Sequence, residues 1–188
     1  MTTPGSHRNP RPRIMRSATD LFSARSAAAV TVNDIAVAAR VSKASLYKEF
    51  PNKDTLVNSV VAERSEDVHR QILESAQRRR PGLERVISLC RDLGIWHTSP
   101  GFTGCLVVNT AIGQQQADET HRIAQEHIRR YHDFITAELM RAAISDPEEV
   151  ASTIVALIEG VTLLAALRSP VAPDLHRIVM KVIDANRI

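Results

Sequence analysis

The chain has 188 residues, 44% of them apolar, which suits one large domain or a small domain joined to a larger one. Its net charge of +3 is uneven, because residues 1–53 hold nine Lys and Arg against three acids, whereas the remainder holds 15 against 18. We find no apolar run near the roughly 20 residues that cross a bilayer and no signal-peptide stretch at the polar start, which argues against a membrane or secreted protein.

Four helices are predicted in the first third of the chain. Apolar residues recur there at helical spacing, and Thr31, Ser42 and Asn52 stand where side-chain oxygens can cap the second, third and fourth helices. Asp34, three residues after Thr31, predicts a capping box with Asp in place of Glu. The predicted helices span residues 13–25, 32–39, 43–49 and 53–79.

Five further helices are predicted in the remainder. Pro-Gly and Ser-Pro turns separate them, and Asp146-Pro147 is typical of a capping residue followed by the first helical position. No segment alternates convincingly as a strand. We therefore predict an all-α fold of about nine helices, with an N-terminal three-helix helix-turn-helix head and a larger helical regulatory body. The later helices span residues 83–97, 104–113, 117–143, 147–167 and 174–185.

The segment Thr31–Phe50 carries the main functional signal. Two short helices separated by three or four residues have the spacing of a helix-turn-helix, whose second helix enters the major groove. Leu46 and Phe50 are spaced to anchor that helix inward. The outward side chains suit phosphates and base edges, as do the free backbone N–H groups at Thr31 and Ser42. These outward residues are Lys43, Ser45, Tyr47 and Lys48.

The segment Arg13–Leu56 resembles the DNA-binding domain of the TetR family (TetR/AcrR-like) of transcriptional regulators. The matching features, in chain order, are Ala18, Leu21-Phe22, Thr31–Ala36, Val41–Lys43, Leu46-Tyr47 and Phe50–Lys53. A weaker match, Gly104–Asn109, is similar to a stretch in one group of the family's regulatory domains. The resemblance implies a disordered basic arm at 1–12, a DNA-binding domain at 13–55, and a ligand-binding and dimerisation domain at 56–188.

The resemblance also implies roles for individual residues. Thr31, Tyr47 and Lys53 would contact phosphates, while Lys43, Ser45 and Lys48 would lie nearest the bases. With Ser42, whose helix start can also bind phosphate, they form the predicted DNA-binding set. The partners implied are a double-stranded operator, a small-molecule effector and a second copy of the chain, joined through the last two helices.

Two positions depart from the family pattern. Arg40 stands in the turn, and Ser26 follows the first helix, at positions where glycine is usual. A non-glycine residue with positive φ is uncommon, so the Arg40 turn is either remodelled or strained, and Arg40 could add a phosphate contact. Arg8, Arg11 and Arg13 could reach the minor groove as an arm does or remain a solvated tail.

An effector pocket is expected on the central helices. Its predicted lining is apolar with a few polar groups, as in most ligand sites. We predict no cofactor beyond the unknown effector, and no metal, because His121, His127 and His132 are spaced unlike paired ligands on one helix face. The predicted pocket residues are Leu93, Trp96, Phe102, Cys105, Leu106, Asn109, Ile128 and Tyr131.

The predicted function is a ligand-responsive repressor that binds a palindromic operator as a dimer in the cytoplasm, associated with a bacterial nucleoid. The alternatives are an activator of the same family, or a helical ligand-binding or redox-sensing module with a weak DNA head. Cys90 and Cys105 lie in apolar segments, where cysteine usually acts as a small hydrophobe. An enzyme is not expected, because phosphate loops, nucleophile elbows and paired acids are lacking.

Overall fold

A computed structural model describes residues 9–113 and 118–187. Within these ranges the chain forms nine α-helices and no β-strand, apart from one isolated bridge between Ile144 and Arg187. The all-α prediction is therefore confirmed. The helices divide between two compact units, Met1–Arg64 with Leu106–Ile123, and Ser65–Cys105 with Ala124–Ile188. This division concerns packing, whereas the division into DNA-binding and ligand-binding domains stays a prediction.

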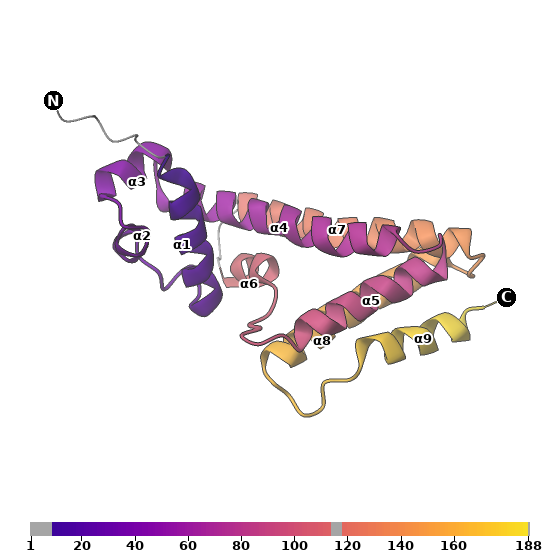
Figure 1. Cartoon of the computed structure of the whole chain (residues 1–188). Helices are drawn as coiled ribbons and strands as arrows, with labels where there is room; N and C mark the ends of the chain where they lie inside the picture. Colours follow the sequence, from indigo (N-terminus) through magenta and orange to yellow (C-terminus); the bar gives the residue numbers. More distant parts are fainter. Residues whose placement is uncertain (1–8, 114–117, 188) are drawn as a thin grey trace. The chain divides into compact units, whose positions relative to one another are not determined.

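The first unit contains a bundle of three short helices. They are α1 (Arg11–Ala24), α2 (Val32–Ala39) and α3 (Lys43–Glu49), drawn in indigo and purple in Figure 1. The unit also contains α6 (Leu106–Gly113), the first part of α4 (Lys53–Gln77) and the start of α7 (Asp118–Arg141). Its apolar interior stabilises the bundle. The fully buried side chains there include Ile14, Ile35, Leu46, Phe50 and Leu56.

The predicted caps are present at three helix starts. The Thr31 hydroxyl accepts from the Asp34 N–H (3.1 Å), and the Asp34 carboxylate accepts from the Thr31 N–H (2.9 Å), which completes the capping box. The Ser42 hydroxyl accepts from the Ser45 N–H (3.0 Å). The Asn52 side-chain oxygen accepts from the Thr55 N–H (2.8 Å). Because each cap satisfies orphan N–H groups, these boundaries follow from local sequence.

The second unit is a helical body. It contains α5 (Leu83–His97), α8 (Pro147–Ala166), α9 (Leu175–Ala185) and the remaining turns of α4 and α7. Within it, α4 and α7 lie side by side, and α5 packs against α8 and α9 (Figure 1). One apolar cluster fills the interior. Its members include Val68, Ile72, Leu89, Leu93, Tyr131, Ile135, Leu139, Ile154, Ile158 and Ile183.

A buried acid of α7 links that helix to the start of α5. The Glu138 side chain is 2% exposed and accepts hydrogen bonds from the Gly82 N–H (2.7 Å), Arg85 Nη1 (2.9 Å) and Arg141 Nη1 (2.7 Å). Gly82 adopts a φ of 95° at the start of α5, a conformation that favours glycine. The carboxylate of α7 thereby fixes the turn between α4 and α5.

Every helix bound lies within two residues of the predicted one, and two helix starts differ from the prediction in kind. Helix α1 begins at Arg11, inside the segment predicted to be a disordered arm, with Pro at its first turn. Asp146 does not cap α8 through its side chain, because its backbone is left-handed (φ 47°) rather than extended as in a capping residue. The preceding Ser145 N–H donates to the Asn186 carbonyl (3.2 Å), a long-range contact that local sequence does not reveal.

Helix α8 corrects the expectation that no apolar segment is long enough to cross a membrane. It has 20 residues and a mean hydropathy of 1.7 over an 18-residue window, 39% of which is buried. By length and composition alone it passes the test for a span, as core helices of soluble proteins also do. Its buried face, including Val150, Ile154 and Ile158, belongs to the apolar cluster of the body.

Candidate nucleic-acid interface and ligand pocket

Helix α3 presents an exposed face and an anchored face. Leu46 and Phe50 are fully buried in the first unit, as predicted. Lys43, Tyr47 and Lys48 are exposed, with Tyr47 at 48%, and no hydrogen bond or ion pair within the described residues engages their side chains. A tyrosine left in solvent beside two free ammonium groups is well suited to phosphate oxygens and base edges.

The other four predicted DNA-binding residues make local contacts. Thr31 forms the cap of α2, and Ser42 and Ser45 share a hydrogen bond between their hydroxyls (2.9 Å) at the start of α3. Lys53 Nζ donates to the Ala28 carbonyl (3.3 Å), which ties the start of α4 to the loop before α2. All four lie in the first unit, and their roles toward DNA stay predictions.

The turn of the motif is strained at Arg40. This residue adopts the left-handed conformation (φ 54°, ψ 50°), and its N–H donates to the Val37 carbonyl (3.1 Å). The geometry that glycine would favour is therefore retained, and the chain absorbs the strain rather than remodelling the turn. Ser26 is not among the described residues with positive φ.

Arg11 is a structural residue rather than part of a free arm. Its guanidinium lies 4.4 Å from the centre of the Phe50 ring, and its Nη1 donates to the Glu49 carbonyl (3.4 Å). Stacking of this kind attaches the start of α1 to the end of α3. Arg8 lies outside the described residues, and Arg13 is exposed on α1.

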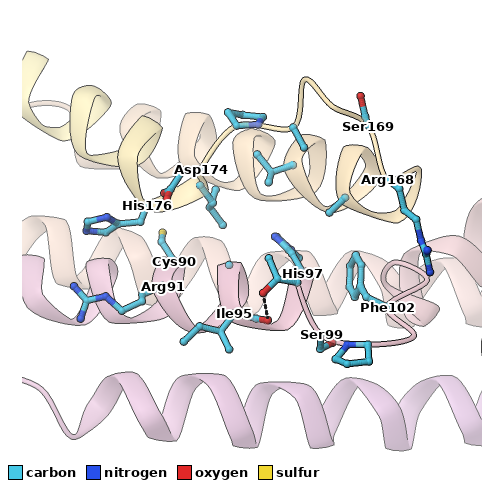
Figure 2. Close-up of a pocket in the computed structure, with 18 of the residues that line it drawn as sticks. Cys90, Arg91, Ile95, His97, Ser99, Phe102, Arg168, Ser169, Asp174 and His176 are labelled. Atoms are coloured by element: carbon cyan, nitrogen blue, oxygen red, sulfur yellow. Dashed lines mark hydrogen bonds between the residues drawn. The ribbon is translucent and has the colours of Figure 1, made fainter.

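A cavity of about 900 Å³ opens in the helical body (Figure 2). It lies between the end of α5, the segment after it, the end of α8 and the segment that leads into α9. Of the eight predicted pocket residues, Phe102 alone lines it. We call it the α5–α8 cavity.

The other predicted pocket residues are distributed over both units. Leu93 and Tyr131 belong to the apolar cluster of the body, with Trp96 and Ile128 packed against it. Cys105 is buried in the same unit. Leu106 and Asn109 lie on α6 in the first unit, the former buried and the latter exposed. Their assignment to an effector pocket stays a prediction.

Two family models match the sequence. The model described as "Bacterial regulatory proteins, tetR family" matches residues 14–60, which include the helix-turn-helix. The model described as "Transcriptional regulator LmrA/YxaF-like, C-terminal domain" matches residues 84–178, more than half of the chain. The chain belongs to the TetR family of bacterial transcriptional regulators. It is a DNA-binding transcriptional regulator, as the sequence analysis predicts.

Solved structures of TetR-family proteins share the fold over nearly the whole chain. SCO4454, a TetR-family transcriptional regulator from Streptomyces coelicolor, is 25% identical with a TM-score of 0.87, covering 95% of this chain and 96% of its own. The regulator sav143 from Streptomyces avermitilis is 26% identical with a TM-score of 0.84, covering 95% and 98%.

A third similar structure contains DNA. A cysteine variant of CifR, solved with a 26-bp double-strand operator, is 22% identical with a TM-score of 0.80, covering 97% of this chain and 99% of its own. At that identity the likeness shows the fold alone. No curated protein sequence matches this TetR-family chain significantly.

A polar cluster in the body of this TetR-family chain was not predicted as a unit. The Ser65 hydroxyl lies 2.9 Å from His127 Nδ1, and Cys105 Sγ lies 3.7 Å from His127 Nε2. The His69 ring packs 4.4 Å from that of His127, and burial, followed by the positive charge of Arg130, lowers the pKa of His69 to about 4. Because α4, α7 and the segment before α6 bring these groups together, residues far apart in the chain form the cluster, and helical periodicity did not predict it.

Cys90 is a poor candidate for a redox sensor. It is fully buried, and burial raises the pKa of its thiol to about 12, which suppresses the reactive thiolate. The structure therefore favours the interpretation of Cys90 as a small hydrophobic residue of the body.

Replacing Arg40 by glycine is expected to raise the free energy of unfolding by up to about 1 kcal/mol, because a left-handed conformation costs a non-glycine residue roughly that amount. Urea unfolding measures the change. Arg25→Gly is the matched control, because Arg25 is extended (φ −141°) and gains nothing from glycine. A variant Arg40→Gly that unfolds at lower urea than the parent contradicts the strain argument.

Proposed function

We propose that this TetR-family regulator is a ligand-responsive repressor that binds a near-palindromic operator as a homodimer. The observation that carries the proposal is the exposed face of α3, where Lys43, Tyr47 and Lys48 are free to meet DNA while Leu46 and Phe50 hold the helix. The excess of basic residues in 1–53 supports the same partner. The CifR complex with operator DNA supports it by analogy of fold.

The pairing of two copies through α8 and α9 is supported by apolar exposure at the end of α8 and just beyond it. Leu163 is 58% exposed, Leu167 69% and Val171 73%. Large apolar side chains in solvent are stabilised when a second copy covers them, and a two-fold axis presents the same surface twice. Two reading helices would then lie about 34–36 Å apart, one turn of DNA.

Regulation requires a ligand that binds the DNA-competent and DNA-incompetent states with different affinity. A ligand with equal affinity for both states leaves the equilibrium between them unchanged. We place the predicted effector site on the central helices of the body, with α4 as the connection that transmits its occupancy. The regulator acts by binding rather than by catalysis, in the cytoplasm where its operator lies. An activator would bind the same DNA. Transcription with purified RNA polymerase distinguishes them, because a repressor lowers and an activator raises the amount of transcript.

Binding to DNA from upstream of the protein's own coding region, compared with a random duplex across a salt series, tests the proposal. We expect tight, selective, salt-sensitive binding of two subunits per operator. The double variant Lys43→Ala/Tyr47→Phe should weaken binding by about 10- to 100-fold, the value of lost charge-assisted hydrogen bonds. Loss of the Lys43 charge from the DNA surface should lower the salt slope by about one unit, because fewer counterions are then released on binding.

The matched control is Arg78→Ala, which removes an exposed positive charge from the turn that follows α4 in the body. This variant should bind the operator like the parent, since its charge lies outside the helix-turn-helix. Unchanged affinity and salt slope in the double variant would show that α3 is not the reading helix. Light scattering that detects monomers at working concentration would overturn the dimer.

A further inference from the structure

The walls of the α5–α8 cavity combine an apolar floor with cationic groups. Val161, Leu175 and the fully buried Cys90 supply apolar surface, and Phe102 adds an aromatic ring. Figure 2 shows side chains from α5, the end of α8 and the start of α9 around this space, with Arg91 and Arg168 among them. A cavity of this size, lined by both apolar and polar side chains, has room for a small molecule.

The charge of the cavity favours an anion. Neither Arg91 nor Arg168 forms an ion pair with an acid of the described residues. Asp174 is the only acid among the residues that line the cavity, and its carboxylate already accepts from the Arg177 backbone N–H (2.9 Å) as the cap of α9. Figure 2 shows the two arginines at opposite ends of the lining, so each is a separate exposed cation, and a guanidinium without an acid partner beside apolar walls attracts a carboxylate.

Arg168 occupies a position where a side chain is costly. The end of α8 closes with Ser169 N–H donating to the Leu164 carbonyl (2.9 Å) and Arg168 N–H donating to the Ala165 carbonyl (3.0 Å). Arg168 adopts a φ of 50° there, the left-handed position at which helices usually carry glycine. Strain of this kind gathers at ligand sites, and here it falls on Arg168, an exposed residue at the edge of the cavity.

His97, which lines the cavity, carries a buried hydrogen-bond acceptor without a partner among the described residues. The Thr162 hydroxyl donates to the Ile158 carbonyl (2.7 Å), so its lone pair accepts from His97 Nε2–H (2.9 Å). Nδ1 therefore carries a lone pair, and it has no hydrogen-bond partner among the described residues although the side chain is only 8% exposed. Burial lowers the pKa of His97 to about 4, which keeps the ring neutral near pH 7.

We propose that the α5–α8 cavity binds a small organic acid with an apolar or aromatic body and a hydroxyl group. The carboxylate pairs with Arg168, the body packs against Phe102 and Val161, and the hydroxyl donates to His97 Nδ1. This site shares Phe102 with the effector pocket predicted on the central helices, and its other lining residues differ. Only its regulatory consequence rests on the proposed function, because binding is measured on the protein without DNA.

Trp96 reports occupancy directly. Its ring lies 4.8 Å from that of Phe102 and 5.9 Å from that of His97, and it is the only tryptophan. Fluorescence and titration calorimetry are measured with three probes: 4-hydroxybenzoate, 4-hydroxycinnamate and 10-hydroxydecanoate. We expect at least one probe to bind with a dissociation constant below about 1 mM. The methyl ester of that acid, which lacks the charge, should bind about tenfold more weakly.

Variants separate the two polar contacts. Arg168→Gln should weaken binding of the acid about tenfold and leave the ester unaffected. His97→Leu removes the Nδ1 acceptor and supplies no other, while the Thr162 hydroxyl keeps its bond to the Ile158 carbonyl, so it should weaken the hydroxylated acid and spare the same acid without its hydroxyl. Arg177→Gln, which removes an exposed charge of α9 outside the lining, should bind like the parent.

Three results overturn the proposal. The first is that none of the three acids binds at about 10 mM. The second is that Arg168→Gln and Arg177→Gln bind alike. The third needs no variant. If the parent binds an acid equally well with and without its hydroxyl, that hydroxyl does not donate to His97 Nδ1. Operator binding that persists through any of these results leaves the proposed function intact.

Discussion

Replacing Glu138 by alanine is expected to lower the free energy of unfolding by about 3 to 5 kcal/mol, the largest single effect that the structure predicts. The carboxylate is 2% exposed and accepts from the Gly82 N–H, Arg85 and Arg141. Its removal leaves the Arg85 guanidinium, 20% exposed, without its acid and the Gly82 N–H without its acceptor. Both losses fall on the turn that starts α5.

Urea unfolding at pH 7.5 measures this change. Asp67→Ala is the matched control, because Asp67 forms an exposed ion pair with Arg70 on α4 (3.2 Å), and such pairs contribute at most about 1 kcal/mol. Glu138→Gln retains acceptor capacity without charge and should fall between the parent and the alanine variant. A loss below about 1 kcal/mol in Glu138→Ala would mean that α5 is held without this network.

Acidification from pH 7.5 to 5 should lower the free energy of unfolding by about 1 to 2 kcal/mol for each of His69 and His97. Burial lowers the pKa of both rings from 6.5 to about 4. Between those values the unfolded chain binds a proton that the native state does not, so stability falls as pH falls. Carboxyl groups with lowered pKa, such as Asp34, act only at more acidic pH.

Urea unfolding at half-unit pH steps tests the expectation. His97→Gln removes one of the two titrating rings, so its stability should change about half as much between pH 7.5 and 5 as that of the parent. A parent curve that is flat over this interval would show that both rings take up protons in the native state. The steepest part should lie between pH 6 and 5, where only the unfolded chain is protonated.

The sequence by itself determined the all-α class, the helix-turn-helix and the family. Each depends on contacts close along the chain: Thr31 with Asp34, Ser42 with Ser45, and the alternation of buried Leu46 with exposed Tyr47. Helix capping and helical periodicity depend on residues that are close in the chain, so the sequence alone predicts them. The sequence also identified Arg40 as an arginine at a turn position that favours glycine, but it left a remodelled and a strained turn as alternatives, and the structure shows the strained one.

Only the tertiary structure decided which distant residues meet. Arg11 stacks on Phe50, Glu138 reaches Gly82, and Ser65 meets His127, in each case between helices far apart in the chain. The cavity beside Arg168 and His97 likewise depends on how α5, α8 and α9 pack. Such contacts follow from the mutual packing of helix faces, and helical periodicity identifies a buried face without naming the residues that will cover it.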